Sequence, residues 1–104
     1  MSPHIQLDVD RIKEFCRKWK IEEFALFGSV LREDFKPDSD IDVLVSFAPD
    51  ARLSLFDYAR MEEELVEIVG REVDVVDRAA VERSENYIRR KHILSNLERV
   101  YVAR

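Results

Sequence analysis

The sequence predicts an α/β domain in which helices cover a small β-sheet. Segments with helical periodicity alternate with short strand-like runs, in the order helix, strand, short helix, strand, helix, strand, helix. The run at residues 40–47 is apolar on both faces beyond Asp42, which is typical of a central strand covered on both sides. With 104 residues, the chain is expected to form a single domain over residues 1–104.

The first predicted helix covers residues 8–19. Apolar residues recur there at the i, i+3, i+4, i+7 spacing of one helix face, namely Ile12, Phe15, Cys16 and Trp19. Asp8 or Asp10 is the candidate N-cap. Cys16 lies on the apolar face, so we interpret it as a buried hydrophobic residue rather than a nucleophile. The apolar run at residues 21–27 is the first predicted strand.

Gly28 ends this strand, and a brief second helix is predicted at residues 29–35. Residues 36–39, Lys-Pro-Asp-Ser, form a loop, because proline fixes φ while Asp and Ser favour turns. The strand at 40–47 follows. Its residues alternate between two faces, with Ile41, Val43 and Val45 on one and Asp40, Asp42, Leu44 and Ser46 on the other.

A long helix is predicted from its cap, Ser54, to Val69, with Gly70 as the C-terminal stop. Its expected apolar stripe comprises Leu55, Tyr58, Ala59, Met61, Leu65, Ile68 and Val69. Residues 72–77 form the third strand, with Asp74 and Val76 on the face opposite Val73 and Val75. A final helix is predicted over about 84–102, with candidate inward residues Tyr87, Ile88, Ile93, Leu94, Leu97, Val100 and Tyr101.

Charge and hydropathy exclude several classes of function. The formal net charge is −5, whereas a general nucleic-acid binder needs concentrated Lys and Arg, so no direct nucleic-acid partner is expected. No apolar run approaches the ~20 residues that span a bilayer, and the N-terminus lacks a signal-peptide pattern. Together with a single cysteine, this predicts a cytoplasmic protein without a membrane partner. The basic cluster at residues 89–92 is expected to be a solvated helix face or a contact for a partner.

Asp40 and Asp42 stand two residues apart at the start of a strand, so their carboxylates are expected to project from the same face. Two carboxylates this close repel each other unless a cation or proton neutralises them. Hard oxygen ligands suit Mg²⁺ or Mn²⁺. Asp74 reaches the same space if the third strand pairs beside the second. Three carboxylates around one or two divalent ions are the arrangement for phosphoryl or nucleotidyl transfer.

Gly28 and Ser29 are the candidate phosphate-binding residues. A glycine at a strand-to-helix turn lets a phosphate approach the backbone closely, and the N–H groups that start the helix, with the Ser29 hydroxyl, can bind its oxygens. Arg32, about one helical turn further, is expected to add a charge-assisted contact. Ser39 completes the set of nucleotide-binding candidates.

These motifs together resemble the nucleotidyltransferase superfamily with the polymerase-β-like fold. Gly28-Ser29 is followed by ten residues, then by Asp40-Ile41-Asp42, and later by Val73-Asp74-Val75. Within the superfamily the chain looks most like the minimal nucleotidyltransferase (MNT) antitoxins of HEPN/MNT toxin–antitoxin pairs, through the stretch LFGSVLREDFKPDSDIDVLVSF and the later YIRRKHIL. The resemblance implies a mixed sheet of three to four strands flanked by helices.

The resemblance also implies roles for these residues. Gly28 and Ser29 would bind the nucleotide phosphates, Asp40 and Asp42 would hold Mg²⁺, and Asp74 would be the third acid, as metal ligand or general base. The reaction would transfer AMP from ATP to a tyrosine of a cognate HEPN ribonuclease toxin and so neutralise it. The chain departs from many relatives at Val30-Leu31, where a more basic segment is common, which increases the expected importance of Arg32.

Three alternatives remain open from the sequence alone. The chain could neutralise a toxin by direct binding with an idle nucleotide site, although three aligned acids favour an enzyme. It could act on a small molecule, but such relatives generally carry an additional helical region for the acceptor. It could also be a metal-free interaction domain whose acids are solvated strand ends. The sequence does not specify the acceptor tyrosine, the number of AMP units or the stoichiometry.

Overall fold

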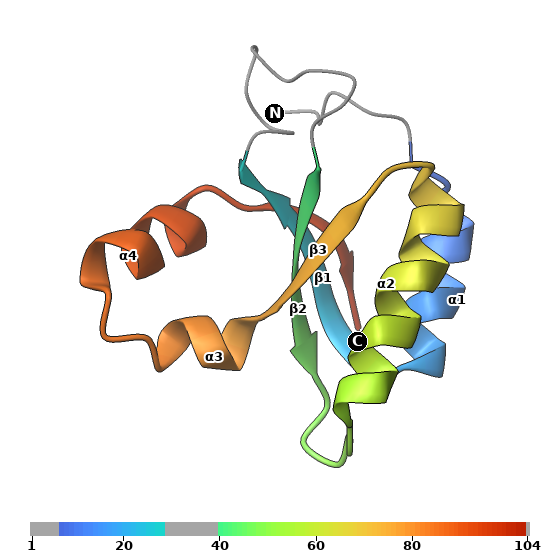
Figure 1. The fold of residues 1–104 in the computed structure, drawn as a ribbon, viewed down its shortest axis with the longest axis horizontal. Coiled ribbons are helices and arrows are strands. Elements are labelled where there is room, and N and C mark those ends of the chain that lie inside the picture. The colour runs from blue at the N-terminus through green and yellow to red at the C-terminus, as the bar shows by residue number, and fades with distance from the viewer. Residues whose placement is uncertain (1–6, 29–39, 104) are drawn as a thin grey trace.

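The computed structural model describes residues 7–28 and 40–103, which form a four-stranded sheet with helices on both faces (Figure 1). The strands are β1 (Ile21–Phe27), β2 (Ile41–Phe47), β3 (Val73–Asp77) and β4 (Glu98–Val102). Their order in the sheet is β3-β2-β1-β4. β2 is parallel to β3 and antiparallel to β1, while β4 is antiparallel to β1. The predicted α/β class and the mixed sheet of three to four strands are confirmed.

The helices divide between the two faces of the sheet. In Figure 1, α1 (Val9–Lys18) and α2 (Leu55–Val69) lie on one side, and α3 (Arg78–Glu82) and α4 (Tyr87–Ser95) lie on the other. Each pair of helices buries its own set of side chains against the sheet. The central strand β2 is therefore covered on both faces, as its apolar pattern predicted.

The ends of α1 and α2 follow from local sequence. The Asp8 carboxylate accepts a hydrogen bond from the backbone N–H of Arg11 at 3.2 Å and caps α1. Ser54 and Asp57 form a reciprocal capping box at the start of α2. Gly70 ends α2 in the left-handed region, at φ 84°, where glycine is favoured. The sequence predicted both helices and their caps.

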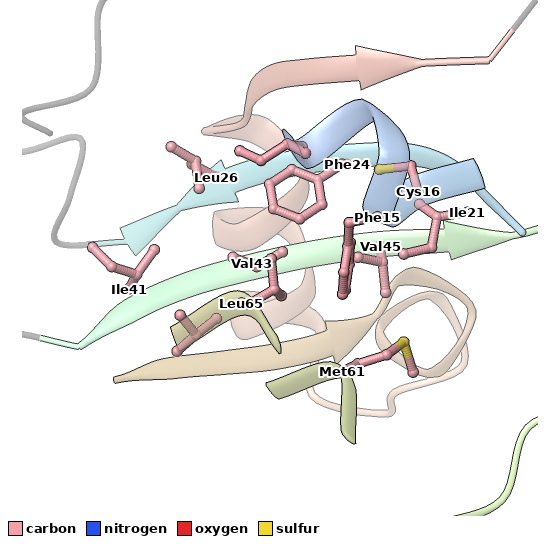
Figure 2. Packing of buried hydrophobic residues seen from close by; sticks show 12 residues of the cluster. Phe15, Cys16, Ile21, Phe24, Leu26, Ile41, Val43, Val45, Met61 and Leu65 are labelled. Atoms are coloured by element: carbon pink, nitrogen blue, oxygen red, sulfur yellow. The ribbon is translucent and has the colours of Figure 1, made fainter. Parts of the chain in front are cut away.

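The larger core lies between the sheet and the pair α1 and α2 (Figure 2). Phe15 of α1 and Phe24 of β1 meet edge to face, with ring centroids 6.4 Å apart. Cys16 is fully buried in this core, and burial raises the pKa of its thiol to about 12. The thiol therefore stays protonated near neutral pH, which confirms its interpretation as a small hydrophobic residue.

A smaller core lies on the opposite face. It consists of Phe27 and Leu44 from the sheet, Val81 from α3 and Ile93 from α4. Leu44 lies two residues after Asp42 on β2, so both side chains project from this face. The smaller core therefore connects α3 and α4 to the face that carries the candidate acids.

The prediction of one helix over residues 84–102 is wrong. α4 ends at Ser95 with Asn96 as its C-cap, and residues 98–102 form the edge strand β4. The physical reason is that β1 needs a second partner for its backbone, and the run Val100-Tyr101-Val102 has strand propensity. The helix α3, capped by the Asp77 side chain, was not predicted.

Several predicted inward residues are exposed. Leu55 and Tyr87 are 88% and 60% exposed, Ile88 is 80% exposed, and Ala59 is also on the surface. Leu55 sits in the first turn of α2, beyond the edge of the core, and α4 packs mainly through Ile93. The predicted helix at 29–35 and the loop at 36–39 lie outside the described residues. No helix in the described ranges is long and apolar enough to cross a membrane.

Leu65→Ala should lower the free energy of unfolding by about 2–5 kcal/mol, because it leaves a cavity in the larger core where Leu65 is fully buried. Leu55→Ala is the matched control in the same helix, and its effect should stay within about 0.5 kcal/mol. Urea unfolding followed by circular dichroism measures both. Equal losses for the two variants would contradict the described packing of α2.

Candidate active site

The candidate site is organised by the pairing of β2 with both of its neighbours. Asp42 is paired with Phe27 on β1 and with Asp74 on β3. All three residues project from the face covered by α3 and α4, since Phe27 belongs to the smaller core. The register therefore aligns the end of β1, the start of β2 and the start of β3 in one row across the sheet.

Asp42 and Asp74 are direct neighbours in this row. Adjacent strands lie about 4.8 Å apart, so the two carboxylates stand side by side on one face. Asp42 is half-buried and Asp74 is exposed. The condition stated from the sequence, that the third strand pairs beside the second, is met, and Asp74 lies next to Asp42.

Asp40 lies one residue before β2 and is exposed. The strand begins at Ile41, whose backbone N–H donates to the Glu72 carbonyl at 2.9 Å. Asp40 thus lies directly before the start of β2, next to the acid pair. It was predicted to be a strand residue, and that prediction is wrong.

Gly28 packs directly against the carboxylate of Asp42. Its φ of 78° lies in the left-handed region, which favours glycine. A Cβ added to Gly28 would overlap Asp42 Oδ2 and stand 3.3 Å from its Cγ. Two independent constraints therefore require glycine at this position: the backbone conformation and the close approach of the carboxylate.

The donor set fits a hard divalent cation shared with a phosphate ligand. Among the described residues, no group of three His, Cys, Asp or Glu side chains is close enough to hold a metal ion by itself. Mg²⁺, however, is commonly bound through one or two carboxylates, with substrate phosphates and water as the other ligands. The neighbours Asp42 and Asp74 supply such a pair, and Gly28 lets the backbone lie directly against the Asp42 carboxylate.

Three predicted nucleotide-binding residues cannot be placed in this geometry. Ser29, Arg32 and Ser39 lie outside the described residues. All three belong to the segment 29–39, and the described residues that flank it, Gly28 and Asp40, lie next to the row of site residues.

An ion-pair network that the sequence does not predict lies near the other end of β1. Glu23 of β1 pairs with Arg78, the first residue of α3, and with Arg99 Nε of β4, the latter at 2.5 Å. It ties the β3–α3 junction and the edge strand to β1. Arg78 and Arg99 lie 55 and 76 positions after Glu23 in the sequence, and no local pattern connects them with it.

Comparison with known proteins identifies a family and several relatives of this chain. The family model described as "Nucleotidyltransferase domain" matches residues 9–99. "Putative protein adenylyltransferase MJ0435" of Methanocaldococcus jannaschii is 42% identical over 59 residues, which are 57% of this chain and 61% of that protein. "Protein adenylyltransferase MntA" of Thermococcus cleftensis is 35% identical over 69 residues, which are 66% of this chain and 68% of that protein.

Solved structures share the fold. A "toxin-antitoxin with AMP-PNP" complex contains a chain that superposes with a TM-score of 0.69 and 20% identity, covering 94% of this chain and 76% of that one. A chain of the "tri-AMPylated Shewanella oneidensis HEPN toxin in complex with MNT antitoxin" superposes with a TM-score of 0.59 and 21% identity. The match covers 91% of this chain and 70% of that one. At these identities the likeness establishes the fold.

Gly28→Ala and Gly70→Ala form a matched pair that isolates the contact with Asp42. Both glycines have positive φ, so each substitution should cost about 1–2 kcal/mol of stability. Only at Gly28 does the added methyl meet a carboxylate, since a Cβ at Gly70 has no neighbour within 4 Å. A crystal structure should show a rotated Asp42 in Gly28→Ala alone. An unmoved Asp42 would contradict the close approach.

The pH dependence of stability should report the Glu23 network. Partial burial raises the pKa of Glu23, but hydrogen bonds from Arg99 and Arg78 outweigh it and lower the pKa below its ordinary value of 4.5. The folded state therefore binds this proton less readily than the unfolded state. The stabilisation is present above pH 4.5 and is lost as pH falls through the folded-state pKa.

Glu23→Gln should remove this dependence. Between pH 5 and about pH 3, unfolding free energies from urea titrations should fall less steeply in the variant than in the wild type. If the unfolding free energies of the two proteins fell equally steeply with pH, the inferred lowering of the Glu23 pKa by Arg78 and Arg99 would be contradicted.

Proposed function

This chain belongs to the nucleotidyltransferase domain family, and on that premise we propose that it is a protein adenylyltransferase that acts as an antitoxin in the cytoplasm. It transfers AMP from ATP to a tyrosine of a cognate HEPN ribonuclease toxin and thereby neutralises the toxin. The tyrosine oxygen forms a bond to the α-phosphorus of ATP, the bond to the leaving phosphate breaks, pyrophosphate departs, and the tyrosine proton passes to a base.

The observation that carries this proposal is the alignment of Asp42 and Asp74 beside Gly28. The backbone at Gly28 can bind phosphate oxygens, and the adjacent carboxylates of Asp42 and Asp74 can bind a cation. Nucleotidyl transfer needs both, because negative charge accumulates on the phosphate oxygens while the leaving group separates. The named activities of the relatives, protein adenylyltransferases, agree with this chemistry.

Each proposed residue has a distinct task. Gly28 and Ser29 receive the phosphates through backbone N–H groups and the serine hydroxyl, with Arg32 and Ser39 as further contacts. Asp40, Asp42 and Asp74 would hold one or two Mg²⁺ ions, which neutralise phosphate charge and orient the nucleotide. Asp74 is exposed and stands beside Asp42, so it is accessible to accept the proton of the attacking tyrosine.

A protein acceptor is supported by the complexes in which the structural neighbours were solved. One holds a toxin that carries three AMP groups, and another combines a toxin–antitoxin pair with an ATP analogue. We therefore propose a hetero-oligomer of this chain with its toxin. Direct neutralisation by binding is the alternative, and the experiment below separates it from catalysis.

Asp42→Asn should reduce transfer of labelled AMP to the toxin at least 100-fold, because a neutral amide binds Mg²⁺ poorly and leaves Asp74 without its partner. The measurement incubates the protein with α-labelled ATP, Mg²⁺ and the product of the adjacent gene. Addition of a chelator should abolish transfer by the wild type.

Asp50→Asn is the matched control. Asp50 is an exposed aspartate three residues beyond the other end of β2, where it pairs with Lys20 at 3.0 Å. Its variant should transfer AMP at the wild-type rate. If Asp42→Asn still neutralises the toxin without labelling it, direct binding replaces catalysis as the explanation.

A further inference from the structure

Helix α4 exposes apolar side chains that a helix in an isolated domain normally buries. Tyr87 and Ile88 are adjacent on α4 and are 60% and 80% exposed, whereas Ile93 is the one buried residue of the helix. Arg90 stacks over the Tyr87 ring at 5.5 Å and donates to the Ser84 carbonyl at 2.9 Å. The Tyr87 ring is thus held in place on the surface, which lowers the entropy cost of binding through it.

The same helix is basic in an acidic chain. Residues 87–95 contain Arg89, Arg90, Lys91 and His92 and no acid, although the net charge of the protein is −5. None of the ion pairs between described residues uses Arg89 or Lys91. The surface of α4 therefore combines exposed apolar groups with positive charge that the described structure leaves uncompensated.

A hollow beside α4 extends this surface. It lies between α3, α4 and β3 and has a volume of about 160 Å³. Its lining includes the apolar residues Val81 and Ile93 and the two arginines Arg89 and Arg90. The hollow therefore suits one apolar side chain of a partner, with a negatively charged residue of the partner beside it.

The position of α4 relates this surface to the candidate active site. Ile93 of α4 shares the smaller core with Phe27, the register partner of Asp42. α4 therefore covers the same face of the sheet from which Asp42 and Asp74 project, as Figure 1 shows for the helix pair α3 and α4. A protein bound to α4 would lie on the side of the molecule where the carboxylates are.

The opposite face offers a different surface. α2 carries the acidic residues Glu62, Glu63, Glu64 and Glu67, and its exposed apolar pair, Leu55 and Phe56, lies at its start. That pair follows the far end of β2, away from the row of site residues. An acidic partner would be repelled by α2 and attracted by α4.

We infer that α4, through Tyr87, Ile88, Arg89 and Lys91 with the adjacent hollow, is the docking surface for the protein acceptor, and that the acceptor presents an acidic segment with exposed apolar side chains. That the protein bound at α4 is the acceptor of AMP rests on the proposed function. The apolar pair supplies buried contact area, and the basic residues orient the acceptor and accelerate its association.

Two double variants test this inference in the full-length protein: Tyr87→Ala/Ile88→Ala and Arg89→Glu/Lys91→Glu. Leu55→Ala/Phe56→Ala is the matched control, since it removes an equally exposed adjacent apolar pair from the opposite face. The probe is the product of the adjacent gene. Its dissociation constant is measured by calorimetry, and its KM by AMP transfer, with thermal unfolding as the check on folding.

Both α4 variants should raise the Kd and the KM for the acceptor roughly tenfold or more, while kcat and the binding of a fluorescent ATP analogue with Mg²⁺ stay within about twofold. The control variant should match the wild type in all four quantities. Added salt should weaken acceptor binding by the wild type more than by Arg89→Glu/Lys91→Glu.

Several outcomes would overturn the inference. These are unchanged acceptor affinity in both α4 variants, a loss confined to the Leu55/Phe56 control, or loss only of self-association or of binding to an oligonucleotide. The calorimetric measurement of the dissociation constant does not depend on catalysis. If the wild type binds the acceptor through α4 but transfers no AMP, the proposed activity fails while the docking surface stands.

Discussion

The register of β2 determines where every described site residue lies. Because side chains alternate between faces, a slip of one residue would turn Asp42 into the larger core and move Val43 to the opposite face. The fully buried residues Ile41, Val43 and Val45 oppose such a slip, since it would remove all three from the larger core and bury the Asp42 carboxylate there. The packing of the larger core thus fixes the position of Asp42 between Phe27 and Asp74.

The two faces of the sheet consequently serve different purposes. The face under α1 and α2 contains most of the buried side chains and supplies stability. The face under α3 and α4 has a smaller core that stops where the acids begin, at the level of Phe27 and Asp42. The Glu23 network ties α3 and β4 to β1 on this second face, so α3 is anchored by charge as well as by apolar contact.

The residues predicted from the sequence were those with strong local signals. The alternation along β2, the capping residue Ser54 and the stop at Gly70 each specify their conformation within a few residues, and all agree with the structure. The pairing of Asp42 with Asp74 could be stated only as a condition, because it depends on contacts between strands far apart in the chain.

The errors arose where tertiary context overrides local pattern. Residues 84–102 have enough scattered apolar residues to resemble one helix, yet the free edge of β1 recruits Glu98–Val102 as a strand. The apolar character of Tyr87 and Ile88 predicts that they face inward, whereas the structure leaves them on the surface. The close approach of Gly28 to Asp42 has no signal in the sequence beyond the glycine itself, because it depends on the pairing of β1 with β2.

The central claim is that Asp42 and Asp74 together bind a divalent ion that also contacts the nucleotide phosphates. The most direct measurement is a crystal structure of the protein with Mn²⁺ and a non-hydrolysable ATP analogue, with the metal located by its anomalous scattering. We expect Mn²⁺ in contact with the Asp42 carboxylate at about 2.1–2.2 Å, with Asp74 and a phosphate oxygen as further ligands. Metal bound only elsewhere, such as at the glutamates of α2, or nucleotide bound away from Gly28, would contradict it.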